Sequence, residues 1–191
     1  MALIPLRRPR KLPFRRQMTR ASVALIHRQN QAGGAELLFI QRAHRDGDPW
    51  SGDMAFPGGR LQAEDRGPFA AAIRETLEET GLDLSVYGRF ERRLSDLITR
   101  HHNRWRPMVV TPYVFEWSGP DNFTQNHEVQ TVVWIPLAHL GAPENQSVRP
   151  WPTRFGTLRM ACCRYQGHCI WGLSYQMLQE YLKHRSAISK P

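Results

Sequence analysis

The sequence predicts one α/β domain, on three observations. The chain has 191 residues, enough for one domain with a sizeable core. Segments typical of β-strands alternate with two segments typical of α-helices, as in α/β proteins. Hydrophobic residues make up 41% and charged residues 23% of the chain, which is usual for soluble globular proteins. No apolar run approaches the ~20 residues that a membrane-spanning helix needs, so no membrane span is expected.

The first elements are predicted to be two strands followed by a long loop. Residues 21–27 and 36–41 are rich in apolar side chains, and the turn-forming residues 30–34 separate them. Asp, Gly and Pro are frequent over residues 43–55, which also carry Trp50, so this stretch is expected to be a loop.

A helix is predicted after the glycine-rich turn at residues 57–59. Proline suits the first helical turn, so the helix should begin near Pro68. Gly81 stands where a left-handed residue commonly ends a helix.

A second, amphipathic helix is expected at residues 171–184. Its apolar side carries Trp171, Leu178 and Leu182, which should join the core. Further strands are predicted at residues 86–98, 107–116, 129–135 and 157–165.

The formal net charge of +9 arises in the N-terminal arm. Residues 1–35 contain eight of the 26 basic residues and no Asp or Glu, which leaves 18 basic and 17 acidic residues elsewhere. We therefore separate a flexible basic arm, residues 1–18, from a domain at residues 19–191. Prolines disfavour a continuous helix in the arm, so a solvated tail is the favoured interpretation. The alternatives are a contact with RNA, anionic lipid or a substrate phosphate, and a mitochondrial presequence.

The cysteines indicate a reducing compartment. Cys162, Cys163 and Cys169 are odd in number and clustered late in the chain, which makes a poor disulfide framework and lacks the spacing of a zinc site. A cytoplasmic protein is therefore expected, with the mitochondrial matrix as the minor alternative. The pair His101-His102 has no carboxylate at metal-binding spacing and is read as a solvated turn.

The predicted helix before Gly81 carries three carboxylates on one side. Glu75, Glu78 and Glu79 follow one another at i, i+3 and i+4, which places them in one stripe. The residues expected to bury against the sheet on the opposite side are Ala70, Ile73 and Leu77.

Such a stripe is self-repelling unless a cation lies between the carboxylates. Mg²⁺ prefers carboxylate oxygen and keeps several waters, and those open positions can engage phosphate oxygens. A bare acidic stripe is more often a solvated helix face, so the flanking residues decide between the two interpretations.

The flanking residues resemble the Nudix box, whose pattern is G-x5-E-x7-R-E-U-x-E-E-x-G-U with U bulky and apolar. The matching residues are Arg74, Glu75, Glu78, Glu79, Gly81 and Leu82, preceded by Phe56-Pro57-Gly58-Gly59. Two departures stand out. The spacing from Gly59 to Arg74 is one residue longer than in the box, which leaves Glu64 and Asp65 as candidates for the early acidic position. Thr76 also replaces a bulky apolar residue.

The resemblance extends to the coenzyme A pyrophosphatase-like branch of the Nudix hydrolases and covers most of residues 20–183. The segments that carry it are residues 37–42, 50–59, 126–129, 134–137 and 167–172. The resemblance implies a Nudix-type α/β/α sandwich with a mixed β-sheet. One departure concerns the substrate, because Asp48 stands where that branch carries an arginine.

The resemblance also implies roles for individual residues. The metal ligands would be Glu75, Glu78, Glu79 and the carbonyl of Gly58, holding Mg²⁺, with Mn²⁺ as an alternative. Arg74 would orient the Glu75 carboxylate, and the general base is left open between Glu75 and Glu128.

Three residues are candidates for substrate binding: Arg42, Trp50 and Phe56. Arg42 could contact phosphate or be an ordinary surface arginine. Trp50 could stack on a base or anchor its loop on the core.

The leading functional hypothesis is a Mg²⁺-dependent hydrolase that cleaves a diphosphate linkage in a nucleoside diphosphate derivative, coenzyme A or a related dinucleotide. The arm motivates a second hypothesis, an RNA 5′ pyrophosphohydrolase, although nucleic acid is not the favoured partner. A third is a non-catalytic nucleotide sensor, which the three retained box carboxylates disfavour. The oligomeric state is open, with a homodimer among the options.

Overall fold

A computed structural model of the chain describes residues 8–47, 50–100, 107–153 and 156–188. The expectations for Asp48 and for His101-His102 fall outside these residues. Within them, no helix is both long enough and apolar enough to cross a membrane.

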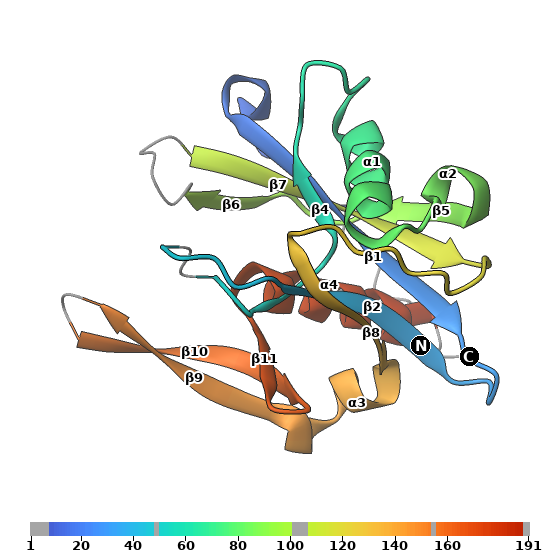
Figure 1. Ribbon diagram of the computed structural model, residues 1–191. Coiled ribbons are helices and arrows are strands. Elements are labelled where there is room, and N and C mark those ends of the chain that lie inside the picture. Colours follow the sequence, from blue (N-terminus) through green and yellow to red (C-terminus); the bar gives the residue numbers. More distant parts are fainter. Residues whose placement is uncertain (1–7, 48–49, 101–106, 154–155, 189–191) are drawn as a thin grey trace, which may run out of the picture.

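The largest element is a mixed sheet of eight strands (Figure 1). Its centre is β1 (Thr19–Gln29), which pairs in parallel with β7 (Pro107–Trp117) and antiparallel with β2 (Ala35–Arg42). The order along the main path is β3-β2-β1-β7-β5, with β4 paired to β1, β6 to β7 and β8 to β2. The remaining strands are β3 (Met54–Ala55), β4 (Gly58–Arg60), β5 (Gly88–Arg93), β6 (Leu97–Arg100) and β8 (Val129–Pro136).

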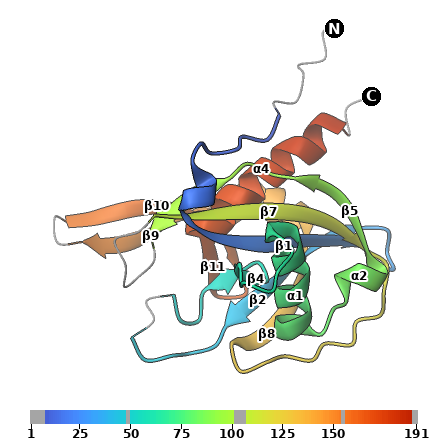
Figure 2. The same ribbon diagram turned by 90° about the horizontal axis from the view of Figure 1, so that it is seen from above.

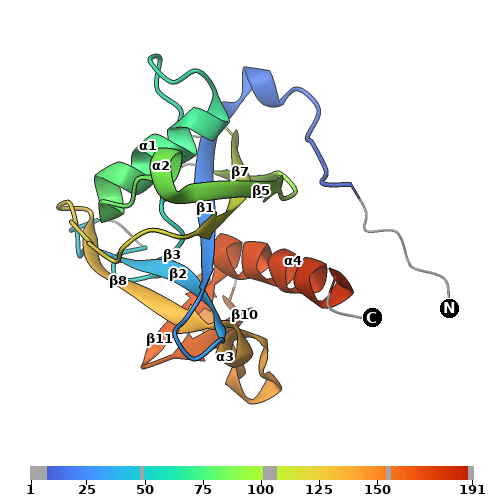
Figure 3. The same cartoon turned by 90° about the vertical axis from the view of Figure 1, so that its right-hand side faces the viewer.

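Helices cover both faces of this sheet. On one side lie α1 (Pro68–Thr80) and the short α2 (Leu84–Tyr87), and on the other lies α4 (Gly172–Ile188), with β1 running between them (Figures 2 and 3). Side chains of β1 alternate accordingly, because successive residues of a strand point to opposite faces. Leu25 packs in the core under α4, whereas Ala24 and Ile26 pack in the core under α1. The predicted α/β/α sandwich is confirmed.

A second, three-stranded antiparallel sheet was predicted only in part. It consists of β9 (Gln146–Thr153), β10 (Gly156–Tyr165) and β11 (His168–Trp171). The strand expected at residues 157–165 is β10. The strand β9 was not predicted, because it contains Pro150 and Pro152 and proline argues against a strand. The helix α3 (Leu137–Gly141) and the 3-10 turn at Pro143–Asn145 connect β8 to this sheet.

The final helix begins at Gly172, one residue later than expected. Trp171 ends β11, so its assignment to the helix was wrong, but it is buried as expected, with its ring tilted against that of Trp151 at a centroid distance of 4.6 Å. Leu178 is fully buried in the core, and Leu182 packs against it, as expected.

The prediction of a single strand at residues 86–98 was also wrong, because this range includes the end of α2, all of β5 and the start of β6. Asp83 caps α2 by accepting a hydrogen bond from the amide of Ser85 at 2.9 Å, so a helical turn precedes β5. The chain then leaves the sheet after Arg93 and returns at Leu97 as β6.

Helix α1 begins and ends where the sequence indicates, but it is rotated relative to the prediction. Gly81 adopts the left-handed conformation with φ of 78° and donates its amide to the carbonyl of Leu77 at 2.9 Å. Leu77, expected to be buried, is 46% exposed. The buried residues of the helix are Ala71, Ala72, Thr76, Glu79 and Thr80.

The rotation has a structural cause. Thr76 and Thr80 direct their hydroxyl groups back to helix carbonyls, so small satisfied side chains can press against the sheet. The buried stripe therefore includes Glu79, and the side expected to be apolar and buried turns partly toward solvent.

Part of the basic arm lies against the domain. The carboxylate of the fully buried Asp96 accepts hydrogen bonds from the amide of Leu12 at 2.9 Å and from Arg15 at 2.8 Å. The amide of Asp96 donates to the carbonyl of Arg10 at 2.9 Å. Arg15 is thus engaged within the protein. The division of the chain at residue 18 stays a prediction.

Candidate active site

The first carboxylate of the site is held where α1 meets β4. The amide of Gly58 donates to Oε2 of Glu79 at 2.8 Å, and Glu79 is only 3% exposed. Gly58 is paired with Val23 of β1 and has a φ of 147°, a value that favours glycine. A Cβ atom at this position would lie 2.2 Å from the carbonyl oxygen of Ser22. Glycine therefore lets β4 approach β1 closely enough to present its amide to Glu79.

The second carboxylate lies against the next residue of the same turn. A Cβ atom on Gly59 would meet the carboxylate of Glu75 at 2.4–2.5 Å, so Glu75 occupies the space that glycine leaves open. An Arg74 Nη2–Glu75 Oε1 ion pair of 2.9 Å holds this carboxylate from the other side.

Arg74 is itself fixed by a bidentate ion pair. Its Nε donates to Oδ1 of Asp65 at 2.9 Å and its Nη2 donates to Oδ2 at 3.0 Å, a geometry that gives strong charge-assisted bonds. These bonds hold the pKa of Asp65 below its usual range, and they raise that of Arg74. Asp65 thus fills the early acidic position that the sequence left open, while Glu64 is exposed.

The third carboxylate of the box does not join the other two. Glu78 is bonded to Nη1 of Arg74 at 3.0 Å, and its side chain is 50% exposed. The predicted stripe therefore grades from the buried Glu79 through the half-buried Glu75 to the solvent-facing Glu78. The role of Glu78 as a metal ligand stays a prediction.

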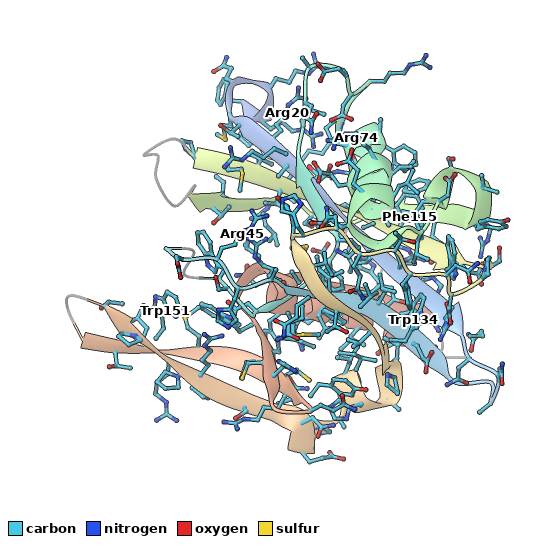
Figure 4. All side chains as sticks on the ribbon, in the orientation of Figure 1. Arg20, Arg45, Arg74, Phe115, Trp134 and Trp151 are labelled. Atoms are coloured by element: carbon cyan, nitrogen blue, oxygen red, sulfur yellow. The ribbon has the colours of Figure 1, made fainter. Side chains whose placement is uncertain are left out.

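The loop before β8 brings a further carboxylate near the helix. Glu128 is 41% exposed at its side chain and forms an ion pair of 3.0 Å with Arg45 of the long loop. Figure 4 shows Arg45 in that loop and Arg74 on α1. The loop is tied here along the backbone as well, because the amide of Ala43 donates to the carbonyl of Glu128 at 2.8 Å.

These carboxylates disfavour one another's charge. Burial raises the pKa of Glu79 to about 8, and repulsion from Glu75 and Glu128 adds to the effect, whereas the amide of Gly58 and the charge of Arg42 oppose it. Burial also raises the pKa of Glu75, although Arg74 counteracts it. The site therefore concentrates negative charge that the described residues neutralise only in part.

A cavity of about 590 Å³ adjoins this cluster. The predicted substrate-binding residues Arg42, Trp50 and Phe56 all line it, together with Gly58 and Gly59. Phe56 is buried and packs on Phe39 with ring centroids 4.5 Å apart, so it forms a fixed wall. Glu75, Glu79 and Glu128 are not part of the lining, but Glu75 touches Gly59 and so lies beside the cavity.

Another part of the cavity lining was not predicted from the sequence. It consists of Ile98, Met108, Val110, Trp171, Leu173 and Met177, which come from β6, β7, β11 and α4. Alternation marks Met108 and Val110 as facing one side of their strand, but in a strand buried on both faces it does not tell a core from a cavity wall.

Comparison with known proteins decides the family. The profile of the NUDIX domain matches residues 18–155, which is most of the chain. The chain belongs to the Nudix family. The matched segment contains Gly58, Gly59 and the whole of α1.

Relatives of this Nudix protein agree with the assignment. A probable nudix hydrolase of Schizosaccharomyces pombe is 29% identical over 87% of the chain and 56% of its own length. The mitochondrial coenzyme A diphosphatase of Homo sapiens is 30% identical over 74% of the chain and 59% of its own length. The chain thus spans little more than half of each. A Nudix hydrolase structure from M. smegmatis superposes with a TM-score of 0.59 at 15% identity, covering 90% of the chain and 87% of that structure, which supports the fold.

The site of this Nudix domain can be tested for its fit to a divalent cation. Among the residues that the structure describes, no three His, Cys, Asp or Glu side chains gather around one point. The donor chemistry nevertheless fits Mg²⁺, which binds through one or two carboxylates and keeps several waters. Glu75 and Glu79 supply two carboxylates whose charge burial and mutual repulsion disfavour, and a cation would relieve that cost.

The raised pKa of Glu79 predicts how the stability of the metal-free protein depends on pH. The pKa rises from 4.5 to about 8 on folding, so the folded state favours the protonated acid. The resulting stability is complete below about pH 4.5 and is lost as the pH rises toward 8. The slope is at most about 1.4 kcal/mol per pH unit. Urea unfolding at several pH values with a chelator should show this loss, and Glu79→Gln should flatten it. An identical pH dependence in both proteins would contradict the prediction.

The two glycines predict opposite outcomes for similar substitutions. In Gly59→Ala the new methyl group meets the far end of a flexible side chain, so the fold should persist while the Glu75 carboxylate moves away. We expect a thermal midpoint within a few degrees of wild type and turnover reduced at least ~10-fold. In Gly58→Ala the methyl group meets backbone atoms, and we expect a loss of about 2–4 kcal/mol in the free energy of unfolding. Equal losses of stability in the two variants would contradict the prediction that Gly58 is needed for the fold and Gly59 for the placement of the Glu75 carboxylate.

Proposed function

We propose that this protein is a divalent metal-dependent hydrolase that cleaves a diphosphate linkage in a nucleoside diphosphate derivative. The single observation that carries the proposal is the placement of two carboxylates, the half-buried Glu75 and the buried Glu79, beside a large cavity. Coenzyme A is the first substrate to try, since one relative is described as a coenzyme A diphosphatase.

Each residue of the box has a physical role in this proposal. The amide of Gly58 fixes Glu79, and Arg74 holds the carboxylate of Glu75. Mg²⁺, or Mn²⁺ in its place, would be held by Glu75 and Glu79, with Glu78 and the carbonyl of Gly58 as further ligands. When bound, such a cation neutralises phosphate oxygens and lowers the pKa of a bound water.

The remaining roles concern the proton and the substrate. Glu75 and Glu128 are the candidates for general base, and the negative charge of each raises the pKa of Glu79. Arg42 lines the cavity, and its positive charge lowers the pKa of Glu79. An arginine in this position is suited to contact a phosphate oxygen. Trp50 and Phe56 line the space into which the group attached to the diphosphate would extend.

A substrate panel tests the proposal. The compounds are coenzyme A, ADP-ribose, ADP-sugars, dinucleoside polyphosphates and 5′-triphosphorylated or capped RNA, each with Mg²⁺, with Mn²⁺ and with a chelator. Mass spectrometry in ¹⁸O-labelled water would identify the products and the phosphorus that is attacked. We expect metal-dependent cleavage of at least one small diphosphate. If none of the compounds is cleaved with either metal, the protein is not this hydrolase.

A further inference from the structure

One charged contact joins two parts of the molecule that lie far apart in the sequence. Arg149 of β9 donates from Nη1 to Oδ1 of Asp53, at the end of the long loop, at a distance of 2.6 Å. The Arg149 side chain is 30% exposed and the Asp53 side chain 12%, so the pair is shielded from solvent. A shielded pair of this kind is stronger than an ion pair on the surface.

The same guanidinium also lies over an aromatic ring. The Cζ atom of Arg149 is 4.3 Å from the ring centroid of Trp171, and the Trp171 ring in turn packs at a tilt against Trp151. Figure 4 shows Trp151 on the second sheet, and Figures 1 and 2 place that sheet and the long loop at the same end of the molecule. Arg149 is therefore fixed by an aromatic face and by a carboxylate at once.

Both partners of Arg149 belong to the cavity. Asp53 and Trp171 both line it, one from the long loop and one from the end of β11. Arg149 is not part of the lining. Its influence on anything bound in the cavity must pass through these two side chains.

Asp53 also controls the stem of the long loop. Its carbonyl accepts the amide of Arg42 at 3.0 Å, and its own amide donates to the carbonyl of Trp50 at 3.2 Å. Arg42 and Trp50 line the cavity as well. A shift of Asp53 would consequently move two further side chains of the cavity wall.

The geometry points to Arg149 as a positioning residue that determines which group attached to the diphosphate the cavity accepts. We name its contacts with Asp53 and Trp171 the Arg149 clasp. The clasp holds the long loop against the second sheet and so sets the width of the cavity. This inference rests on the proposed function. The ligand class is a nucleoside diphosphate carrying a bulky or extended second group, because the cavity that adjoins the carboxylate cluster is also lined by Trp171.

The first arm of the test does not depend on activity. Trypsin cleaves after arginine, and Arg45 is exposed in the long loop. Release of the loop in Arg149→Ala and in Asp53→Asn should increase cleavage after Arg45 about 10-fold. The matched control is Arg159→Ala, which removes the same charge from an exposed position on the neighbouring strand β10. Equal cleavage in Arg149→Ala and Arg159→Ala would overturn the clasp.

The second arm measures selectivity. For coenzyme A and ADP-ribose, Arg149→Ala should raise KM about 10-fold with kcat nearly unchanged, because binding is lost equally in the ground and transition states. For a nucleoside triphosphate, which has no second group, KM should change little. Arg149→Met keeps the stem without the charge, and it should behave like Arg149→Ala. An equal change for all substrates would indicate a structural role alone and overturn the inference.

A binding measurement separates this inference from the proposed function. Calorimetry with coenzyme A and ADP-ribose, using wild type and Arg149→Ala, reports affinity without turnover. If wild type binds one of these two compounds but cleaves no compound of the panel, the proposed function fails, and the ratio of affinities decides the clasp. If wild type binds neither compound, the cavity is not a site for this ligand class and the inference is wrong.

Discussion

Turnover of the best substrate in the panel should fall at least ~100-fold in Glu79→Gln and in Glu75→Gln. Glutamine has the size of glutamate but lacks its charge, so the change removes a cation ligand rather than a packing element. The loss corresponds to about 3 kcal/mol or more of transition-state stabilisation, as expected for a metal ligand. Steady-state kinetics with saturating Mg²⁺ would measure it.

A stability measurement and a matched variant serve as controls for this prediction. Glu79→Gln should be at least as stable as wild type above pH 8 without metal, since the buried charge is gone. Glu64→Gln makes the same change at an exposed position outside the site and should retain full activity. Near-wild-type turnover in both Glu75→Gln and Glu79→Gln would disprove the catalytic role of the helix.

The free energy of unfolding should fall by about 3–5 kcal/mol in Asp96→Ala. Asp96 is fully buried, and its carboxylate accepts from Leu12, Arg15 and Thr111, with Arg93 also paired to it. Removal of one member of a buried charged network leaves the others unpaired, which costs more than the lost contacts themselves. Urea unfolding at pH 7 would measure the change.

The same network has a defined pH dependence. Burial alone would raise the pKa of Asp96, but the hydrogen bonds and the charge of Arg93 hold it below the usual range. The stability that this group adds is therefore present above pH ~4 and is lost as the pH falls below that value.

A double-mutant cycle would show whether the arm is part of this network. Arg15→Ala should cost less than Asp96→Ala, and the double variant should cost little more than Asp96→Ala alone. Additive losses would mean that the arm contributes independently of Asp96. Arg16→Ala removes a neighbouring charge that has no contact with Asp96 and serves as the control.

The sequence by itself determined the family, the sandwich and the position of α1. These features rest on local rules. The spacing of Arg74, Glu75 and Glu79 is a property of one helix, and Gly81 ends that helix because glycine adopts the left-handed conformation readily. The apolar-rich segments of β1 and β2, separated by turn-forming residues, likewise predicted strands from neighbouring positions alone.

The tertiary structure decided which of those residues share an environment. Glu78 matches the box as well as Glu79 does, yet one is half exposed and the other buried, because the helix is rotated by close packing at Thr76 and Thr80. The prediction that Leu77 is buried was wrong for the same reason. Periodicity defines the faces of a helix, but which face is buried depends on what it packs against.

Contacts between charged residues far apart in the sequence could not be predicted at all. Arg15 reaches Asp96 across 81 positions, and Arg149 reaches Asp53 across 96. No local pattern encodes such pairs, since each partner alone resembles an ordinary surface charge. Only the folded chain removes water from around them, and that loss of solvent is what turns two separate charges into a strong, specific contact.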